Sequence, residues 1–90
     1  EVLKDVAFAP VPLDTEAALA LIGELKGAAL LDGVRGAKPA DKAALAELMV
    51  ALSRFAADHA EQIAEIDLNP VIVHPEGEGL SVVDALIVKT

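Results

Sequence analysis

Residues 62–88 have the sequence QIAEIDLNPVIVHPEGEGLSVVDALIV, and this stretch decides the fold. Its two halves are rich in Ile, Leu and Val, which favour extended structure, and they flank a turn-forming segment at 75–79. The pattern predicts a β-hairpin with strands over 62–73 and 80–88. A tip at Glu76-Gly77, or a loop over 75–78, pairs Asn69 with Asp84, whereas a loop with an odd number of residues shifts the register.

Two segments upstream of the hairpin show the spacing of amphipathic helices. The first covers residues 14–26, with Asp14 as N-cap and Lys26-Gly27 at its end. The second begins at Asp41 as N-cap and ends near Asp58-His59-Ala60. Its apolar stripe consists of Leu45, Leu48, Met49, Leu52, Phe55 and Ala56.

Two further strands are expected, over residues 2–9 and 29–31. Pro10 and Pro12 follow the first of them, and prolines cannot donate to a strand ladder. The element order is then β-α-β-α-β-β. We therefore expect an α+β fold in which two helices pack on one face of a mostly antiparallel sheet, and residues 1–90 form a single domain.

The composition argues against several classes of protein. The chain has 90 residues, of which 54% are hydrophobic, with two Phe as its only aromatic residues, no Cys and a net charge of −8. Nucleic-acid-binding modules need a basic face, a membrane span needs about 18 apolar residues in a row, and disulfides need cysteine. We expect no nucleic-acid partner, no membrane span and a cytoplasmic location. The high apolar fraction predicts a surface that contacts another part of a larger protein.

Polar side chains recur along the first strand of the hairpin. Alternate side chains of a strand share a face, so Glu65, Asp67 and Asn69 are expected on one face, opposite Ile66 and Leu68. Carboxylate and amide oxygens are the ligands that Mg²⁺ prefers. The alternative to a cation site is a solvated acidic face of the sheet.

Asp84 adds a candidate ligand from the second strand. It interrupts the apolar run 82–87, which is predicted to be buried, and an unpaired carboxylate there would be costly. Directly opposite residues of a hairpin have Cβ atoms about 4.5–5.5 Å apart. In the predicted register, Asp67, Asn69 and Asp84 are therefore candidate ligands of one metal ion.

The same residues carry a family resemblance. The segment Glu65-Ile66-Asp67-Leu68-Asn69-Pro70-Val71, followed by Val83-Asp84-Ala85, resembles the C-terminal lobe of the ATP-grasp domain. The resemblance is to ADP-forming acyl-CoA synthetases of the acetate–CoA ligase type, relatives of the succinyl-CoA synthetase β subunit. Residues 1–8, Pro12-Leu13 and the segment 30–36, which contains Gly33-Val34-Arg35-Gly36, resemble further segments of the family, although the spacing before Pro12 differs from its usual pattern.

The resemblance implies a lobe that binds ATP and Mg²⁺, with Asp67, Asn69 and Asp84 serving the ions on the ATP phosphates. The role of Glu65 stays open, and Arg35 either contacts a phosphate or pins its own loop. The implied chemistry is phosphoryl transfer between ATP and a phosphohistidine, coupled to the formation of acyl phosphate and acyl-CoA. No residue of this chain is expected to be catalytic.

The resemblance also implies partners outside residues 1–90. These are the N-terminal ATP-grasp lobe and the CoA-binding and phosphohistidine domains of the parent enzyme, and oligomerisation is compatible with them. His59 and His74 do not match the phosphorylated histidine, and the isolated chain is expected to be inactive. The alternatives are a non-catalytic α+β binding or regulatory module, and the ATP-grasp part of a protein acetyltransferase with the same domain architecture.

Overall fold

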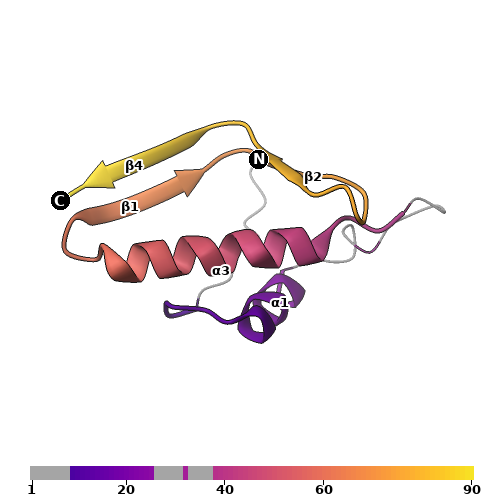
Figure 1. Ribbon diagram of the computed structural model, residues 1–90, viewed down its shortest axis with the longest axis horizontal. Coiled ribbons are helices and arrows are strands. Elements are labelled where there is room, and N and C mark those ends of the chain that lie inside the picture. Colours follow the sequence, from indigo (N-terminus) through magenta and orange to yellow (C-terminus); the bar gives the residue numbers. More distant parts are fainter. Residues whose placement is uncertain (1–8, 26–31, 33–37) are drawn as a thin grey trace.

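The computed structural model describes residues 9–25, 32 and 38–90. In chain order the elements are α1 (Thr15–Gly23), α3 (Lys42–Asp58), β1 (Ile63–Leu68), β2 (Val71–Val73), β3 (Leu80–Val82) and β4 (Ala85–Lys89). The strands form one layer, α3 runs along beneath them, and α1 lies on the far side of α3 (Figure 1). The α+β prediction is confirmed, since both helices lie on the same side of antiparallel strands. The strand expected at 29–31, and all but the last residue of the one expected at 2–9, lie outside the described residues.

The first helix is shorter than predicted. The Asp14 carboxylate accepts a hydrogen bond from the Ala17 N–H at 2.7 Å, which confirms the N-cap. The helix ends at Gly23 rather than at residue 26 because glycine is a poor helix former. The Glu24 N–H donates to the Leu21 carbonyl at 3.1 Å, which tightens the last turn. The predicted cap at Lys26-Gly27 lies outside the described residues.

The second helix, α3, matches its predicted bounds and lies between the two other layers. Its best-buried residues are Ala46 and Ser53, which are 0% and 4% exposed. Ala46 forms a small buried cluster with Ala18 and Ile22 of α1, and the partly buried residues around this cluster are Leu45, Met49 and Val50. The prediction that Phe55 belongs to the buried stripe is wrong. Phe55 is 42% exposed, and its ring lies against that of His59, with the centroids 4.3 Å apart.

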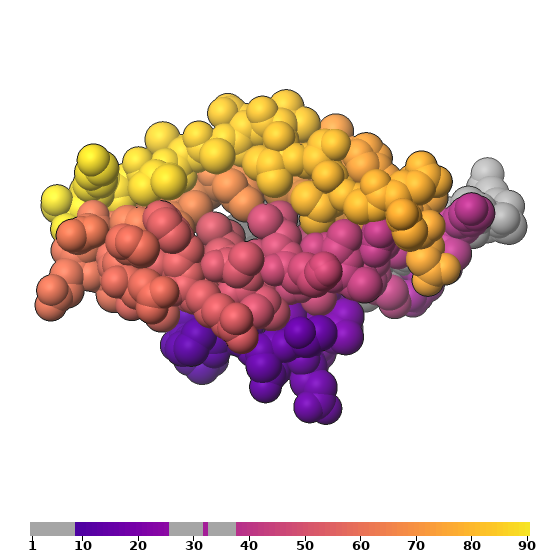
Figure 2. Space-filling model, viewed as in Figure 1, coloured from indigo at the N-terminus to yellow at the C-terminus, as the bar shows by residue number. Residues whose placement is uncertain are grey.

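β3, β4 and the residues between them expose an apolar surface. Large hydrophobic side chains of β3, β4 and the residues between them are 40–59% exposed, namely Val82, Val83, Leu86, Ile87 and Val88. The prediction that the run 82–87 is buried is therefore wrong within the described part of the chain, because no described element covers this surface. Figure 2 shows the strands as the outermost layer, with an opening between them and α3. Neither described helix is long and apolar enough to cross a membrane.

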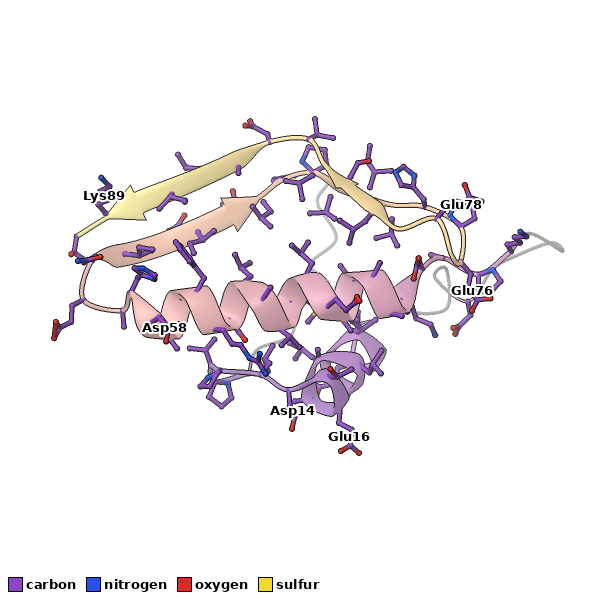
Figure 3. All side chains as sticks on the ribbon, in the orientation of Figure 1. Asp14, Glu16, Asp58, Glu76, Glu78 and Lys89 are labelled. Carbon is purple, nitrogen blue, oxygen red and sulfur yellow. The ribbon has the colours of Figure 1, made fainter. Side chains whose placement is uncertain are left out.

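Several charged side chains mark the ends of helices and strands. Asp14 and Glu16 mark the start of α1, Asp58 marks the end of α3, and Lys89 lies at the end of β4 (Figure 3). Acidic side chains at a helix N-terminus interact favourably with the helix dipole, as the position of Glu16 illustrates.

Ser53 ties the segment before α1 to α3. Its hydroxyl donates to the Val50 carbonyl at 2.9 Å and accepts a hydrogen bond from the Leu13 N–H at 2.8 Å. Ser53 is 4% exposed and Leu13 is half-buried, so solvent has limited access to this hydrogen bond. The hydroxyl therefore links the segment before α1 to α3, and it also donates a hydrogen bond to a carbonyl of its own helix.

We expect Ser53→Ala to destabilise the fold by about 1–3 kcal/mol, because it leaves the half-buried Leu13 N–H without its acceptor. Urea unfolding of the chain measures the change. Ser81→Ala is the comparison variant. Ser81 is exposed, and its Oγ contact with His74 Nε2 at 2.8 Å is open to solvent, so its loss should cost less than the loss of the Ser53 hydroxyl. Equal effects of the two substitutions would contradict this role for Ser53.

Candidate functional site

The hairpin is divided into two short ladders. β1 pairs with β4 and β2 pairs with β3, both antiparallel. Each of the two predicted strands is interrupted, one at Asn69-Pro70 and the other at Val83-Asp84. Pro70 has no N–H, so a continuous ladder is not available at this point.

The predicted register is confirmed on both sides of the interruption. Asp67 pairs with Leu86 in one ladder, and Val71 pairs with Val82 in the other. Asn69 therefore lies across from Asp84, and the Asn69 N–H donates to the Asp84 carbonyl at 3.1 Å.

The interruption also changes which residues face α3. In β1, Leu68 is half-buried and Asp67 is exposed, as the predicted alternation requires. Strict alternation would place Val71 on the same face as Asp67, yet Val71 is half-buried and its neighbour Ile72 is 48% exposed. The alternation of inward and outward side chains therefore shifts by one residue between β1 and β2. This shift lets Leu68 and Val71 both face inward while the carboxylate of Asp67 stays on the outer face.

The three predicted metal ligands lie together. Asp67, Asn69 and Asp84 line one pocket of about 250 Å³, together with Ala85 and Leu86. All three ligand candidates are exposed, and Asp84 Oδ1 also accepts a hydrogen bond from the Ala85 N–H at 2.9 Å. Within the described ranges, no three His, Asp or Glu side chains are grouped as a metal site. The donor set is thus two carboxylates and an amide, which fits a hard cation that keeps part of its water shell.

The other candidates lie apart from this pocket. Glu65 lines a different, mostly apolar pocket of about 310 Å³ between α3 and β1. Arg35 lies outside the described residues. The His59 ring hydrogen-bonds through Nδ1 to the Phe55 carbonyl oxygen at 2.9 Å, and His74 Nε2 lies 2.8 Å from Ser81 Oγ.

Asp41 has a second role that the sequence prediction missed. Its Oδ1 accepts from the Ala44 N–H at 3.0 Å, as expected for an N-cap. Its Oδ2 accepts from the backbone N–H groups of Gly77 and Gly79, at 3.1 and 2.8 Å, in the turn between β2 and β3. The side chain is 9% exposed. The helix start and the hairpin turn therefore share one carboxylate, which we call the Asp41 clamp.

The donors around Asp41 favour its ionised form. The hydrogen bond from the Ala44 N–H, followed by that from Gly79, holds the pKa of the Asp41 carboxyl below its usual range. Burial acts in the opposite direction, and the Gly77 N–H adds to the lowering of the pKa. The sequence feature that relates to this contact is the pair of glycines in the turn. Both adopt positive φ, at 87° and 79°, a conformation that favours glycine.

Comparison with known proteins identifies the family of this fold. Residues 1–88 match a family described as an ATP-grasp domain. The chain belongs to the ATP-grasp family. This ATP-grasp chain is 49% identical over 87 residues to a trans-feruloyl-CoA synthase from an unknown prokaryotic organism. It is also 42% identical over 88 residues to the β subunit of the ADP-forming acetate–CoA ligase II of Pyrococcus furiosus.

A solved structure has the same fold. The dinucleotide-forming acetyl-coenzyme A synthetase 1 of Candidatus Korarchaeum cryptofilum, in complex with coenzyme A and Mg-AMPPCP, matches with a TM-score of 0.87 and 41% identity. The match covers 96% of this ATP-grasp chain and 39% of that chain. The matches to the two sequence relatives cover 97% and 98% of this chain. They cover 12% of the length of the synthase and 37% of the length of the β subunit.

We expect the stability that Asp41 contributes to depend on pH. The pKa is lowered in the folded state, so the contribution is present above the unfolded pKa of about 3.9 and is lost as pH falls through the folded value. Asp41→Asn is an uncharged isostere of the side chain. Unfolding measured from pH 7 to pH 2 should show wild type more stable at neutral pH, with the two chains converging in acid. A stability difference that stays constant across this range would contradict the prediction.

We expect Gly79→Ala to destabilise the fold by about 1–2 kcal/mol, because alanine is strained in the left-handed conformation that Gly79 adopts. Gly23→Ala is the matched control. Gly23 is helical, and nothing lies within 4 Å of an added Cβ, so alanine there should stabilise the fold by about 0.5–1 kcal/mol. Thermal unfolding of the two variants should give shifts of opposite sign, and shifts of the same sign would refute this account.

Proposed function

We propose that residues 1–90 form a single lobe of the ATP-grasp domain of an ADP-forming acyl-CoA synthetase, and that Asp67, Asn69 and Asp84 hold Mg²⁺ on the ATP phosphates. ATP binding is the property of the family to which the chain belongs. The observation that carries the proposal for Mg²⁺ is that the three oxygen-bearing side chains line one pocket at the interruption of the hairpin. They come from two strands in a register that the two flanking ladders define.

The backbone around the pocket leaves these side chains available for a ligand. The Asn69 N–H donates to the Asp84 carbonyl at 3.1 Å, and the Val83 N–H donates to the Pro70 carbonyl at 3.0 Å. These two hydrogen bonds hold the strands together across the interruption without using the side chains of Asp67 or Asn69. The Asp67 and Asn69 side chains stand on the exposed face, where they can bind a ligand that arrives from outside this lobe.

Each residue has a role that follows from its chemistry. Asp67 and Asp84 supply negative charge, and the Asn69 amide oxygen supplies a neutral donor between them. When bound, Mg²⁺ would offset the charge of phosphate oxygens during phosphoryl transfer. Glu65 lines the pocket between α3 and β1 instead and is not assigned to the metal site.

The wider reaction belongs to the same proposal. It is phosphoryl transfer between ATP and a phosphohistidine, coupled to the formation of acyl phosphate and acyl-CoA in a cytoplasmic enzyme. The other ATP-grasp lobe and the CoA-binding and phosphohistidine domains lie outside residues 1–90, so the isolated chain is inactive. In support, the similar Korarchaeum synthetase was solved with coenzyme A, Mg-AMPPCP and a phosphohistidine segment that points towards its nucleotide-binding site. The non-catalytic module and the protein acetyltransferase are not favoured, because the matched relatives are a CoA synthase and CoA ligases.

We expect Asp67→Asn and Asn69→Ala to reduce Mg²⁺-dependent ATP turnover of the full-length protein by more than about tenfold, since even indirect partners of a metal site typically contribute about 10–100-fold. Turnover is measured at several Mg²⁺ concentrations, so that weaker metal binding is separated from loss of the folded enzyme.

Glu65→Gln is the matched control for these variants. It removes a carboxylate from the same strand, but Glu65 lines the other pocket, so turnover should stay within about twofold of wild type. Wild-type turnover in both Asp67→Asn and Asn69→Ala would rule out the proposed site.

A further inference from the structure

We infer that Asp41 is a positioning residue for the Asp67/Asn69/Asp84 site, because the Asp41 clamp sets the strand register that brings Asp84 opposite Asn69. The inference rests on the proposed function of that site and extends it to a residue on another element. Asp41 belongs to the start of α3 and does not line the pocket. Its effect on the site is therefore exerted through the hairpin.

The two carboxylate oxygens of Asp41 serve different elements. Oδ1 accepts the Ala44 N–H and caps α3, whereas Oδ2 accepts the N–H groups of both Gly77 and Gly79. Hydrogen bonds to a charged acceptor are roughly twice as strong as those between neutral groups. The turn is thus anchored at two of its own backbone groups to a point on a rigid helix.

Backbone contacts add to the anchoring on both sides of the turn. The Asp41 N–H donates to the His74 carbonyl at 2.8 Å, and the Glu76 N–H donates to the Pro39 carbonyl at 2.8 Å. The His74 N–H donates to the Gly79 carbonyl at 2.9 Å and closes the turn. A shift of the turn by one residue would break the contacts with Asp41, because it would move a different N–H group into the position of each glycine.

The ladder next to the turn is too weak to set the register alone. It contains only three residue pairs, from Val71–Val82 to Val73–Leu80. Isolated two-stranded ladders are marginally stable in water, and a register is weakly specified where side chains of both faces are exposed. Val82 is 41% exposed and Ile72 is 48% exposed, so burial provides little discrimination between registers.

The register matters because strand side chains alternate between faces. A slip of one residue turns every side chain of a strand to the opposite face. Asp84 would then leave the face that carries Asp67, and the donor set would be divided between the two sides of the hairpin. The Asp41 clamp, with the backbone hydrogen bonds beside it, links the register of β2 and β3 to α3, and the β1–β4 ladder continues the same register beyond the interruption.

Asp41→Ser separates helix capping from the clamp. Serine is as good an N-cap as aspartate, but its single, shorter oxygen serves the helix only. Asp14→Ser makes the same exchange at the N-cap of α1, where the Ala17 N–H is the one hydrogen-bond partner of the carboxylate among the described residues. Ser53→Ala is a second control, because it weakens the fold without contacting the hairpin turn.

The experiment uses the full-length protein with two measurements. The first is the Mg²⁺ concentration that gives half-maximal ATP turnover, and the second is hydrogen exchange at the Asn69 and Val83 amides, which bond across the interruption. We expect Asp41→Ser to raise that Mg²⁺ concentration by about 10–100-fold and to speed exchange at both amides. Asp14→Ser should change neither quantity appreciably, and Ser53→Ala should leave the Mg²⁺ concentration unchanged and speed exchange at the two amides less than Asp41→Ser does.

Two results would overturn the inference. One is unchanged exchange at Asn69 and Val83 in Asp41→Ser, and the other is a shift in Mg²⁺ dependence no larger than that of Asp14→Ser while Asp67→Asn shifts it strongly. If Asp67→Asn itself leaves the Mg²⁺ dependence unchanged, the proposed function fails. The exchange of the two amides then decides by itself whether Asp41 sets the register.

Discussion

The buried carboxylate of Asp41 is the interaction on which the arrangement of this chain depends. It accepts one hydrogen bond within α3 and two from the turn between β2 and β3, so the helix and the hairpin meet at a single side chain. Its charge is satisfied by backbone N–H groups, including those of a helix N-terminus, where an anion is favoured. This matters because β2 packs on α3 close to the clamp, whereas a pocket separates part of β1 from the same helix.

The interruption at Asn69-Pro70 lets one hairpin meet two structural requirements. The strands must turn apolar residues towards α3, and they must also present oxygen atoms on the outer face. An uninterrupted strand would place Val71 on the same face as Asp67. Either Val71 would then face outward or Asp67 would face α3. The change of phase at Pro70 satisfies both requirements, and the Asn69 and Val83 N–H groups donate across the interruption to the Asp84 and Pro70 carbonyls.

Features that depend on neighbouring residues could be predicted from the sequence. The N-caps at Asp14 and Asp41 and the pairing of Asn69 with Asp84 follow from local turn and helix chemistry, and the structure confirms them. Burial of 82–87 could not be predicted, because it depends on which elements cover a strand rather than on its own composition. The second partner of Asp41 was missed for the same reason, since Gly79 lies 38 positions along the chain.

The fixed register also constrains the length of the hairpin. Asn69 and Asp84 stand opposite each other because equal numbers of residues separate them from the tip of the turn. One residue inserted between them would move Asp84 to the other face, unless a β-bulge absorbed the extra residue. Two inserted residues would restore the pairing. Relatives that keep Asp67, Asn69 and Asp84 should therefore differ in the length of the segment between Asn69 and Asp84 by even numbers of residues.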